Sequence, residues 1–205
     1  MILLLDNGTT KDDKLSYTNH IVKSLNQQKI TYLKVNTIRN IDKILHKIKG
    51  IIITGSSLKL SKLSKTGHFD KYSFNMYYIS RLNVPIYGIC FGCQLLNIIY
   101  GGELKDNKKY LCDDYDFYKY NPNCPLFNGS THVNYTYCFS DLVIPNKKMG
   151  VTVFSSTQID GKLLDTGFEF EKGRVFGSLF HPECRRDTEF VYSNFYEFCK
   201  KYIPV

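Results

Sequence analysis

The chain lacks any apolar run that approaches the roughly 18 residues needed to span a membrane, so we expect no transmembrane helix. The opening apolar segment 1–5 reaches Asp6 too soon for a signal peptide, and no basic segment precedes it. We therefore expect a cytoplasmic protein. Internal repeats, low-complexity tracts and linkers are also missing, and 205 residues suit one domain, so we predict a single domain over residues 1–205.

Dense basic clusters are absent too. The net charge of +8 comes from 27 Lys and Arg against 19 Asp and Glu, and the lysines are spread along the chain. The aromatic residues sit mostly in apolar-periodic segments, not between basic clusters as in many nucleic-acid sites. We therefore expect a solvated basic surface and no nucleic-acid site, while attraction of an acidic ligand or partner stays open. The seven cysteines are an odd number, and without a secretory signal we expect no disulfide framework.

The first half of the sequence alternates strand and helix patterns. Apolar runs predict buried strands, and spacings of three and four predict helices between them. The strands are expected at 2–5, 30–35, 51–54 and 84–89, and the helices at 17–26, 38–48, 69–82 and 94–100. The polar segment 56–67 predicts a loop. This order is typical of an α/β fold with an open, mostly parallel sheet and helices on both faces.

The second half carries shorter, alternating and aromatic-rich segments. They predict a small section of strands, some antiparallel, at 133–139, 142–144, 151–155, 168–171 and 174–180. A last helix is expected over 187–202, with Asp187 as its N-cap.

The sharpest chemical feature is the segment 88–94, Gly-Ile-Cys-Phe-Gly-Cys-Gln, which follows an apolar strand and opens a helix. A tight strand-to-helix turn with a nucleophile between small residues is a nucleophile elbow. Cys90 would lie at a helix N-terminus, where the helix dipole favours the thiolate, and the Phe91 N–H would be able to stabilise an oxyanion. Two other interpretations remain open: Cys90 is a small buried residue, or it forms a redox pair with Cys93.

A cysteine nucleophile needs a base, and His181 is the candidate that the sequence singles out. It lies at the end of the predicted strand 174–180, and Pro182 keeps the chain extended after it. Because residues i and i+2 of an extended segment face the same side, Glu183 would be able to orient the imidazole. Taken alone, a His-Pro-Glu segment is about as consistent with a simple turn at a strand end as with a catalytic site.

The two motifs in this order, 91 residues apart, resemble those of the class I (triad) glutamine amidotransferases, and the resemblance covers nearly the whole chain. The family's opening strand is similar to segment 4–8, and its oxyanion strand and loop are similar to segment 51–56. Residues 193–195 fit the family's last helix. The Asp-Asn-Gly opening and the length are most similar to stand-alone glutaminase subunits of GMP synthetases. The resemblance implies a flavodoxin-like fold.

The resemblance also implies a mechanism. Cys90 would attack the side-chain amide of glutamine and form a γ-glutamyl thioester, while His181, oriented by Glu183, would pass a proton to the leaving ammonia. The remaining roles it implies are an oxyanion hole at the N–H groups of Ser56 and Phe91, and substrate binding by Gly55, Gln94, Phe139 and Ser140. It implies no cofactor and no metal. Because the chain has no P-loop or ATP-pyrophosphatase motif, an ATP-dependent synthetase would be a separate partner.

Three departures from the family pattern leave alternatives open. Gly55 is followed by two serines where a second glycine is usual, so a positive φ at Ser56 would strain the oxyanion loop. Cys93 replaces a residue that is usually His. In the segment 138–141 only Asp141 remains of the usual Ser-His-Gly-Asp. A γ-glutamyl hydrolase or peptidase, and a non-catalytic regulatory subunit on the same fold, are therefore the alternatives to a glutaminase.

Overall fold

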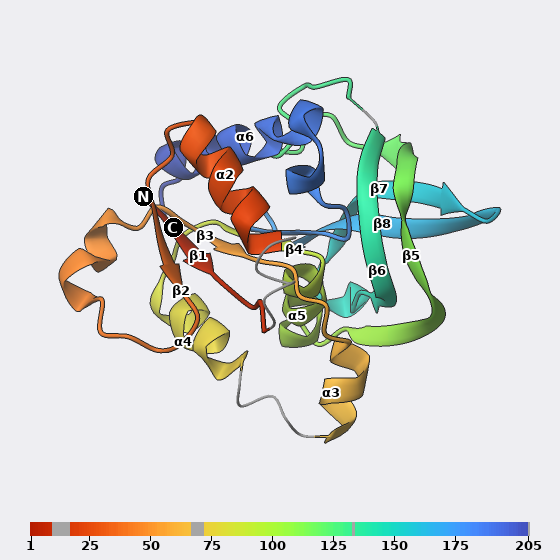
Figure 1. Ribbon diagram of the computed structural model, residues 1–205, viewed down its shortest axis with the longest axis horizontal. Coiled ribbons are helices and arrows are strands. Elements are labelled where there is room, and N and C mark those ends of the chain that lie inside the picture. The colour runs from red at the N-terminus through yellow and green to blue at the C-terminus, as the bar shows by residue number, and fades with distance from the viewer. Residues whose placement is uncertain (10–16, 67–71, 133, 205) are drawn as a thin grey trace.

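The computed structural model describes residues 1–9, 17–66, 72–132 and 134–204. Their strands form one nine-stranded sheet in the order β2-β1-β3-β4-β9-β8-β7-β5-β6 (Figure 1). The strand bounds are β1 Ile2–Leu5, β2 Tyr32–Val35, β3 Gly50–Ile53, β4 Ile86–Ile89, β5 Glu103–Tyr120, β6 Asn134–Ile144, β7 Thr152–Ile159, β8 Lys162–Glu171 and β9 Val175–Ser178. The four central strands β1, β3, β4 and β9 are buried along their whole length, as apolar runs covered on both faces must be.

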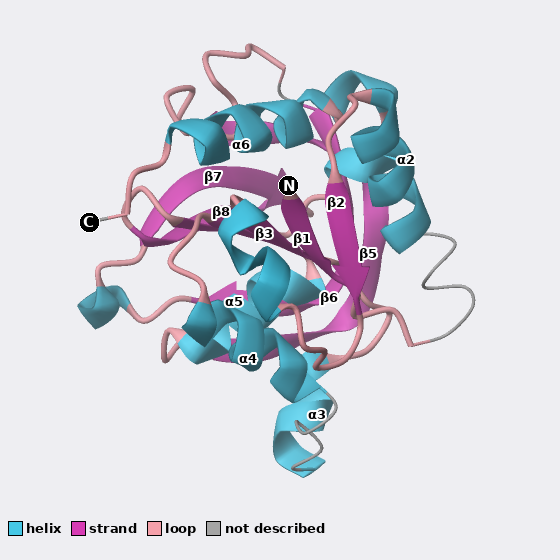
Figure 2. Cartoon of the chain, turned by 90° about the vertical axis from the view of Figure 1, so that its left-hand side faces the viewer, coloured by secondary structure: helices cyan, strands magenta, loops and turns pink. Residues whose placement is uncertain are grey.

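Helices cover both faces of this sheet, as expected for the α/β class (Figure 2). Helices α2 and α6 lie on one face, and α3, α4 and α5 lie on the other. Their bounds are α2 Asn19–Gln27, α3 Leu60–Thr66, α4 Ser73–Arg81, α5 Phe91–Ile99 and α6 Phe190–Lys201, with short 3₁₀ turns η2 Asp42–Lys47, η4 Lys147–Met149, η5 Pro182–Cys184 and η6 Arg186–Thr188. None of the described helices is long and apolar enough to span a membrane.

The α/β class is confirmed, but the sheet is more evenly mixed than expected. The pairs that join β2, β1, β3, β4 and β9 are parallel, whereas those that join β9, β8, β7, β5 and β6 are antiparallel. The antiparallel strands therefore continue the main sheet through β9. They curl away from the parallel strands on the right of Figure 1.

Several predicted elements were wrong. The segment 38–48 contains the 3₁₀ turn η2 and no α-helix, the loop 56–67 contains α3, and 103–120 forms an unpredicted strand. The two strands predicted at 133–139 and 142–144 are one strand, β6, and Asp187 lies in η6, so it does not cap α6. The predicted starts at 69–71 and at Val133, and residue 67, fall outside the described residues.

One pair of cysteines forms a disulfide, although the sequence predicts no disulfide framework. Cys112 and Cys138 lie directly opposite each other on β5 and β6, with their Cα atoms 4.1 Å apart, and are joined by a disulfide. Adjacent antiparallel strands bring opposite residues this close. Because the sequence does not predict β5, it could not reveal the pairing. The other five cysteines are free.

Candidate active site

The predicted site residues meet at one edge of the parallel strands. Strands β3, β4 and β9 are neighbours and run in the same direction, so their carboxyl ends lie together. Cys90 directly follows β4, and its N–H donates to the carbonyl of Ser178, the last residue of β9, at 2.7 Å. The structure thus brings together the two motifs that lie 91 residues apart in the sequence.

Cys90 occupies a strained turn. Its φ of 51° and ψ of −103° make it one of four described non-glycine residues with positive φ, and it is the N-cap of α5. The flanking glycines make room for this turn: a Cβ on Gly88 would lie 2.6 Å from the backbone of Gly92, and a Cβ on Gly92 would lie 2.4 Å from the carbonyl oxygen of Ile53. The segment has the geometry of a nucleophile elbow.

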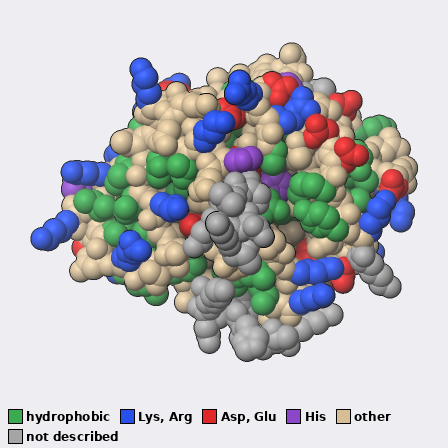
Figure 3. Space-filling view, viewed as in Figure 1, with side chains coloured by type: hydrophobic (Ala, Val, Ile, Leu, Met, Phe, Trp, Pro, Cys, Tyr) green, Lys and Arg blue, Asp and Glu red, His purple; other side chains and the backbone are tan. Residues whose placement is uncertain are grey.

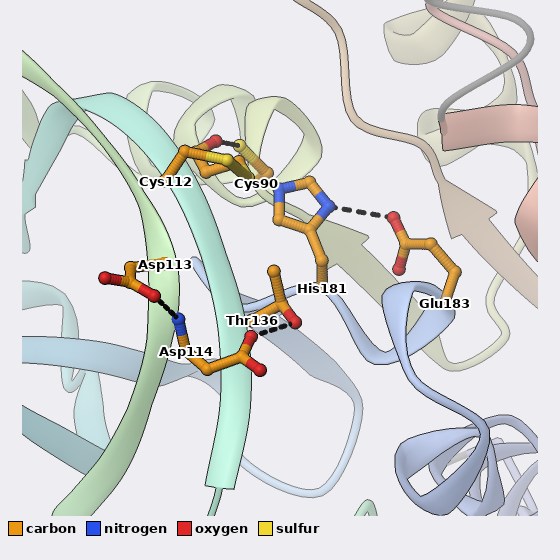
Figure 4. The surroundings of a disulfide bond; sticks show 8 residues. Cys90, Cys112, Asp113, Asp114, Thr136, His181 and Glu183 are labelled. Atoms are coloured by element: carbon orange, nitrogen blue, oxygen red, sulfur yellow. Dashed lines mark hydrogen bonds and ion pairs between the residues drawn. A yellow bond between two sulfur atoms is a disulfide. The ribbon is translucent and has the colours of Figure 1, made fainter.

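The imidazole of His181 lies between the side chains of Cys90 and Glu183 (Figure 4). Its Nδ1 donates to Glu183 Oε1 at 2.8 Å, and both side chains are buried. Its backbone N–H donates to the carbonyl of Thr136 on β6, which fixes the turn that carries it. The buried Nε2 has no hydrogen bond of ordinary geometry to the described residues and interacts with the Cys90 side chain, so this nitrogen remains available to that thiol or to a substrate.

The environment of His181 favours the charged imidazolium. Burial alone lowers the pKa of His181, but the charges of Glu183 and Cys90 raise it, and the net pKa lies well above its ordinary value of 6.5. A protonated imidazole beside a sulfur atom is suited to hold a thiolate and then to donate a proton to a leaving amine.

Two further contacts surround the imidazole. The ring of Tyr17 stacks on His181 with centroids 5.2 Å apart, and Gly55 passes so close that a Cβ there would lie 3.3 Å from His181 Cε1. On the far side, the Tyr192 hydroxyl donates to Glu183 Oε2 at 2.9 Å. The sequence analysis missed Tyr17 and Tyr192, because nothing in their local pattern distinguishes them from ordinary core tyrosines.

The predicted oxyanion residues lie at the same edge. Phe91 is the first residue of α5, and the first four N–H groups of a helix have no partner within it. Ser56 is buried three residues beyond β3, next to the elbow strand. It is not among the residues with positive φ, so the strain that its side chain would have caused does not arise.

Three of the residues predicted to hold the substrate lie on or against strand β6. The side-chain amide of Gln94 donates to the carbonyl of Asp141 at 3.0 Å. Phe139 is buried and Ser140, on the opposite face of β6, is half-buried. Cys90 Sγ donates to the carbonyl of Cys138 at 3.3 Å, so the segment 138–141 lies beside the elbow.

The Asp141 carboxylate of the segment 138–141 is already hydrogen-bonded within the protein. The two carboxylate oxygens of Asp141 accept hydrogen bonds from the Ser61 N–H and Oγ, both at 2.7 Å. Because Asp141 is almost fully buried, these bonds fix the start of α3 against β6. The segment 138–141 therefore holds α3 in place through Asp141 and also lies beside the elbow through the carbonyl of Cys138.

Cys93 lies on the side of α5 that packs against strand β9. It is free and fully buried against Gly177, and burial, followed by the charge of Cys90, raises its pKa well above 9.0. A thiol that stays protonated in the core is a poor redox partner for Cys90.

Charged side chains elsewhere are dispersed. Figure 3 shows lysines and arginines scattered over the visible face, with acidic side chains among them. Among the residues that the structure describes, no group of three or more His, Cys, Asp or Glu side chains is arranged to hold a metal ion.

Known proteins are similar to this chain in sequence. The family profile described as "Glutamine amidotransferase class-I" matches residues 9–198. A GMP synthase of Dictyostelium discoideum is 42% identical over 62 residues, which cover 30% of this chain and only 8% of that protein. A glutamine-hydrolyzing GMP synthase subunit of Methanobrevibacter smithii is 27% identical over 205 residues, which cover 93% of this chain and 94% of that one.

The fold has solved relatives as well. The crystal structure of a candidate GMP synthase subunit from Thermoplasma acidophilum superposes with a TM-score of 0.76 at 22% identity, covering 98% of this chain and 94% of that one. At 22% identity, this structural similarity supports the fold and not the function. The family profile, however, spans almost all of the described fold and includes both motifs at the sheet edge. This chain therefore belongs to the class I glutamine amidotransferases.

Proposed function

We propose that the protein hydrolyses the side-chain amide of glutamine through a Cys90–His181–Glu183 triad and supplies the ammonia to a separate synthetase. The observation that carries this proposal is the buried line from the elbow cysteine through the imidazole to the carboxylate at one sheet edge. The family membership supports the choice of glutamine as the substrate.

In the first half-reaction, the Cys90 thiolate attacks the amide carbon of glutamine. The carbonyl oxygen becomes an oxyanion, which the N–H groups of Phe91 and Ser56 are proposed to stabilise. The imidazolium of His181 then donates its Nε2 proton to the amide nitrogen. The carbon–nitrogen bond breaks, ammonia leaves, and a γ-glutamyl thioester remains on Cys90.

In the second half-reaction, the neutral imidazole takes a proton from water, and the resulting hydroxide attacks the thioester. The carbon–sulfur bond breaks, glutamate leaves, and the Cys90 thiolate and the imidazolium are restored. The carboxylate of Glu183 accepts the Nδ1–H of His181, so that Nε2 is the atom that exchanges protons with substrate.

The acceptor of the ammonia is proposed from the relatives. Three of them are named as individual subunits of a glutamine-hydrolyzing GMP synthase and are separate chains of similar length to this one. Their names favour a partner synthetase that makes GMP. A cytoplasmic location and a single domain remain predictions from the sequence.

The test is glutamate release from glutamine by the purified protein, beside Cys90→Ala and Cys93→Ala. We expect activity in the wild type and in Cys93→Ala and none in Cys90→Ala, because Cys90 lies at the elbow beside His181 whereas Cys93 is buried against Gly177. A wild type that releases no glutamate, either by itself or together with the synthetase chain of a GMP synthetase, would refute the proposal.

The γ-glutamyl alternative has one observation in its favour, the engagement of Asp141 by Ser61, which leaves that carboxylate unavailable to a substrate. The same assay with γ-glutamyl peptides decides between the two. A clear preference for peptides over glutamine would replace the glutaminase proposal with a hydrolase of the same triad.

A further inference from the structure

The carboxylate of Glu183 has two oxygens, and each has its own buried donor. His181 Nδ1 donates to Oε1 at 2.8 Å, and the hydroxyl of Tyr192 donates to Oε2 at 2.9 Å. His181 and Tyr192 are fully buried and Glu183 is 4% exposed, so water does not replace either donor. The catalytic line proposed above thus extends by one residue into helix α6.

The donor on Oε2 controls how the carboxylate is turned. Glu183 lies in the short turn η5, where the Cys184 N–H donates to the His181 carbonyl at 3.2 Å. A carboxylate held at one oxygen is free to rotate about its last bond, whereas one held at both oxygens is fixed. Tyr192 therefore determines where Oε1 points, and with it the plane of the imidazole.

Contacts between helix α6 and the turn η5 fix the position of Tyr192 relative to Glu183. Thr188, just before the helix, donates its hydroxyl to the carbonyls of Pro182 and Arg185, which flank Glu183. The Tyr192 N–H in turn donates to the carbonyl of Glu189. The start of α6 and the turn η5 are thereby tied together, so the hydroxyl is delivered by a rigid element.

The hydroxyl also acts electrostatically. Burial, followed by the charge of Glu183, raises the pKa of Tyr192 well above 10.0, so the phenol stays protonated and can only donate to this oxygen. Hydrogen bonds to a carboxylate stabilise its charged form, and the charged form of Glu183 is what favours the imidazolium. Without the hydroxyl, Oε2 would be a buried charged acceptor with one donor fewer.

We propose that Tyr192 is a positioning residue of the site, whose hydroxyl fixes and stabilises the Glu183 carboxylate so that His181 presents Nε2 to Cys90. This inference rests on the proposed triad. The Tyr192 hydroxyl donates to Glu183, so Tyr192 acts on His181 and Cys90 through that carboxylate.

The test replaces Tyr192 by phenylalanine, which removes only the hydroxyl. We expect kcat for glutamine hydrolysis to fall about 10- to 100-fold, the size expected for a lost hydrogen bond to a charged group. We expect little change in KM, and the alkaline limb of the pH profile should move to lower pH because the imidazolium is held less strongly. Tyr78→Phe is the matched control, since Tyr78 is a fully buried helical tyrosine with a hydrogen-bonded hydroxyl remote from the triad.

A double-mutant comparison separates positioning from general stability. If Tyr192 acts through Glu183, then Tyr192→Phe has no further effect on kcat in a Glu183→Gln background, whereas a purely structural role would lower it again. The double variant buries no unpaired charge, so it keeps the test available if Tyr192→Phe alone fails to fold.

The rate of Cys90 alkylation by iodoacetamide near pH 7, followed by mass spectrometry, does not depend on turnover. We expect it to fall in Tyr192→Phe and to be unchanged in Tyr78→Phe. Wild-type-like kcat, alkaline limb and alkylation in Tyr192→Phe would overturn the role of Tyr192 and leave the glutaminase intact. A wild type inert toward glutamine would instead refute the proposed function, and the alkylation rates would then decide the role of Tyr192 alone.

Discussion

Gly92, at the start of helix α5, offers the sharpest test of how the elbow is built. In an ordinary helix, alanine in place of glycine stabilises by about 0.5–1 kcal/mol, because the unfolded chain loses freedom. At Gly92 the added Cβ would lie 2.4 Å from the carbonyl oxygen of Ile53 and 2.9 Å from its Cβ. These atoms belong to a central buried strand and have no open space into which to move.

The magnitude follows from that contact. An ordinary Cβ contact begins near 3.4 Å, so α5 and β3 must separate by about 1 Å. Overpacking of this kind costs about 1–3 kcal/mol, which leaves a net loss of up to about 2.5 kcal/mol once the helical gain is subtracted. For a chain of this length, each kcal/mol lowers Tm by about 2–4 °C, so Gly92→Ala should lower Tm by up to about 10 °C. Cys90 is the N-cap of the same helix, and a shift of about 1 Å at a reacting atom can lower kcat about 100-fold.

The assays are thermal unfolding and glutamate release, with Ser80→Ala at the exposed end of α4 as a control that should change stability by no more than about 0.5 kcal/mol. A Gly92→Ala protein with a raised Tm and wild-type kcat would show that helix propensity outweighs the contact. The close approach of α5 to β3 would then not be what shapes the elbow.

Three further predictions concern charge, cross-linking and capping. The raised pKa of His181 keeps the imidazole protonated above pH 6.5, and the proton is lost as the pH rises through the raised pKa. Glu183→Gln should therefore move the alkaline limb of kcat/KM to lower pH, and an unmoved limb in a pH–rate series would contradict this. Reducing the Cys112–Cys138 bond should lower the free energy of unfolding by about 2–4 kcal/mol in urea titrations, and a Cys112→Ser protein should not respond to reductant. Asp141→Ala should cost about 1.5–3 kcal/mol and should speed amide exchange in α3, and equal exchange rates would exclude the capping role.

The parallel half of the fold was readable from the sequence because its signals are local. The apolar runs at 2–5 and 51–53 can only be buried strands, and the alternation of strands and helices leads to the open sheet. The elbow and the His-Pro-Glu segment were found for a similar reason, since each places its chemistry within a few residues of a strand end.

The elements that the sequence did not reveal depend on distant partners. Strand β5 begins with the polar run 103–109, which has little strand propensity and forms because β6 pairs with residues 103–106. Helix α3 is short and rich in Ser and Lys, and its capping carboxylate comes from Asp141, 80 residues away. Tyr17 and Tyr192 reach the imidazole and its carboxylate only in the folded chain, so no local pattern marked them.

The place of β9 in the sheet has a consequence for how the protein is made. Strand β4, which leads to Cys90, pairs on one side with β9, which is synthesised about 90 residues later. At about 5–20 residues per second, that side of β4 waits roughly 4–18 s on the ribosome for its partner. During this time an apolar strand edge is open to wrong pairing, and the proposed nucleophile Cys90 is already translated but the proposed base His181 is not. The pairing of β4 with β9 thus brings Cys90 and the His181 segment together in the same step that closes the sheet, so a misfolded chain with a free β4 edge would lack the assembled proposed triad.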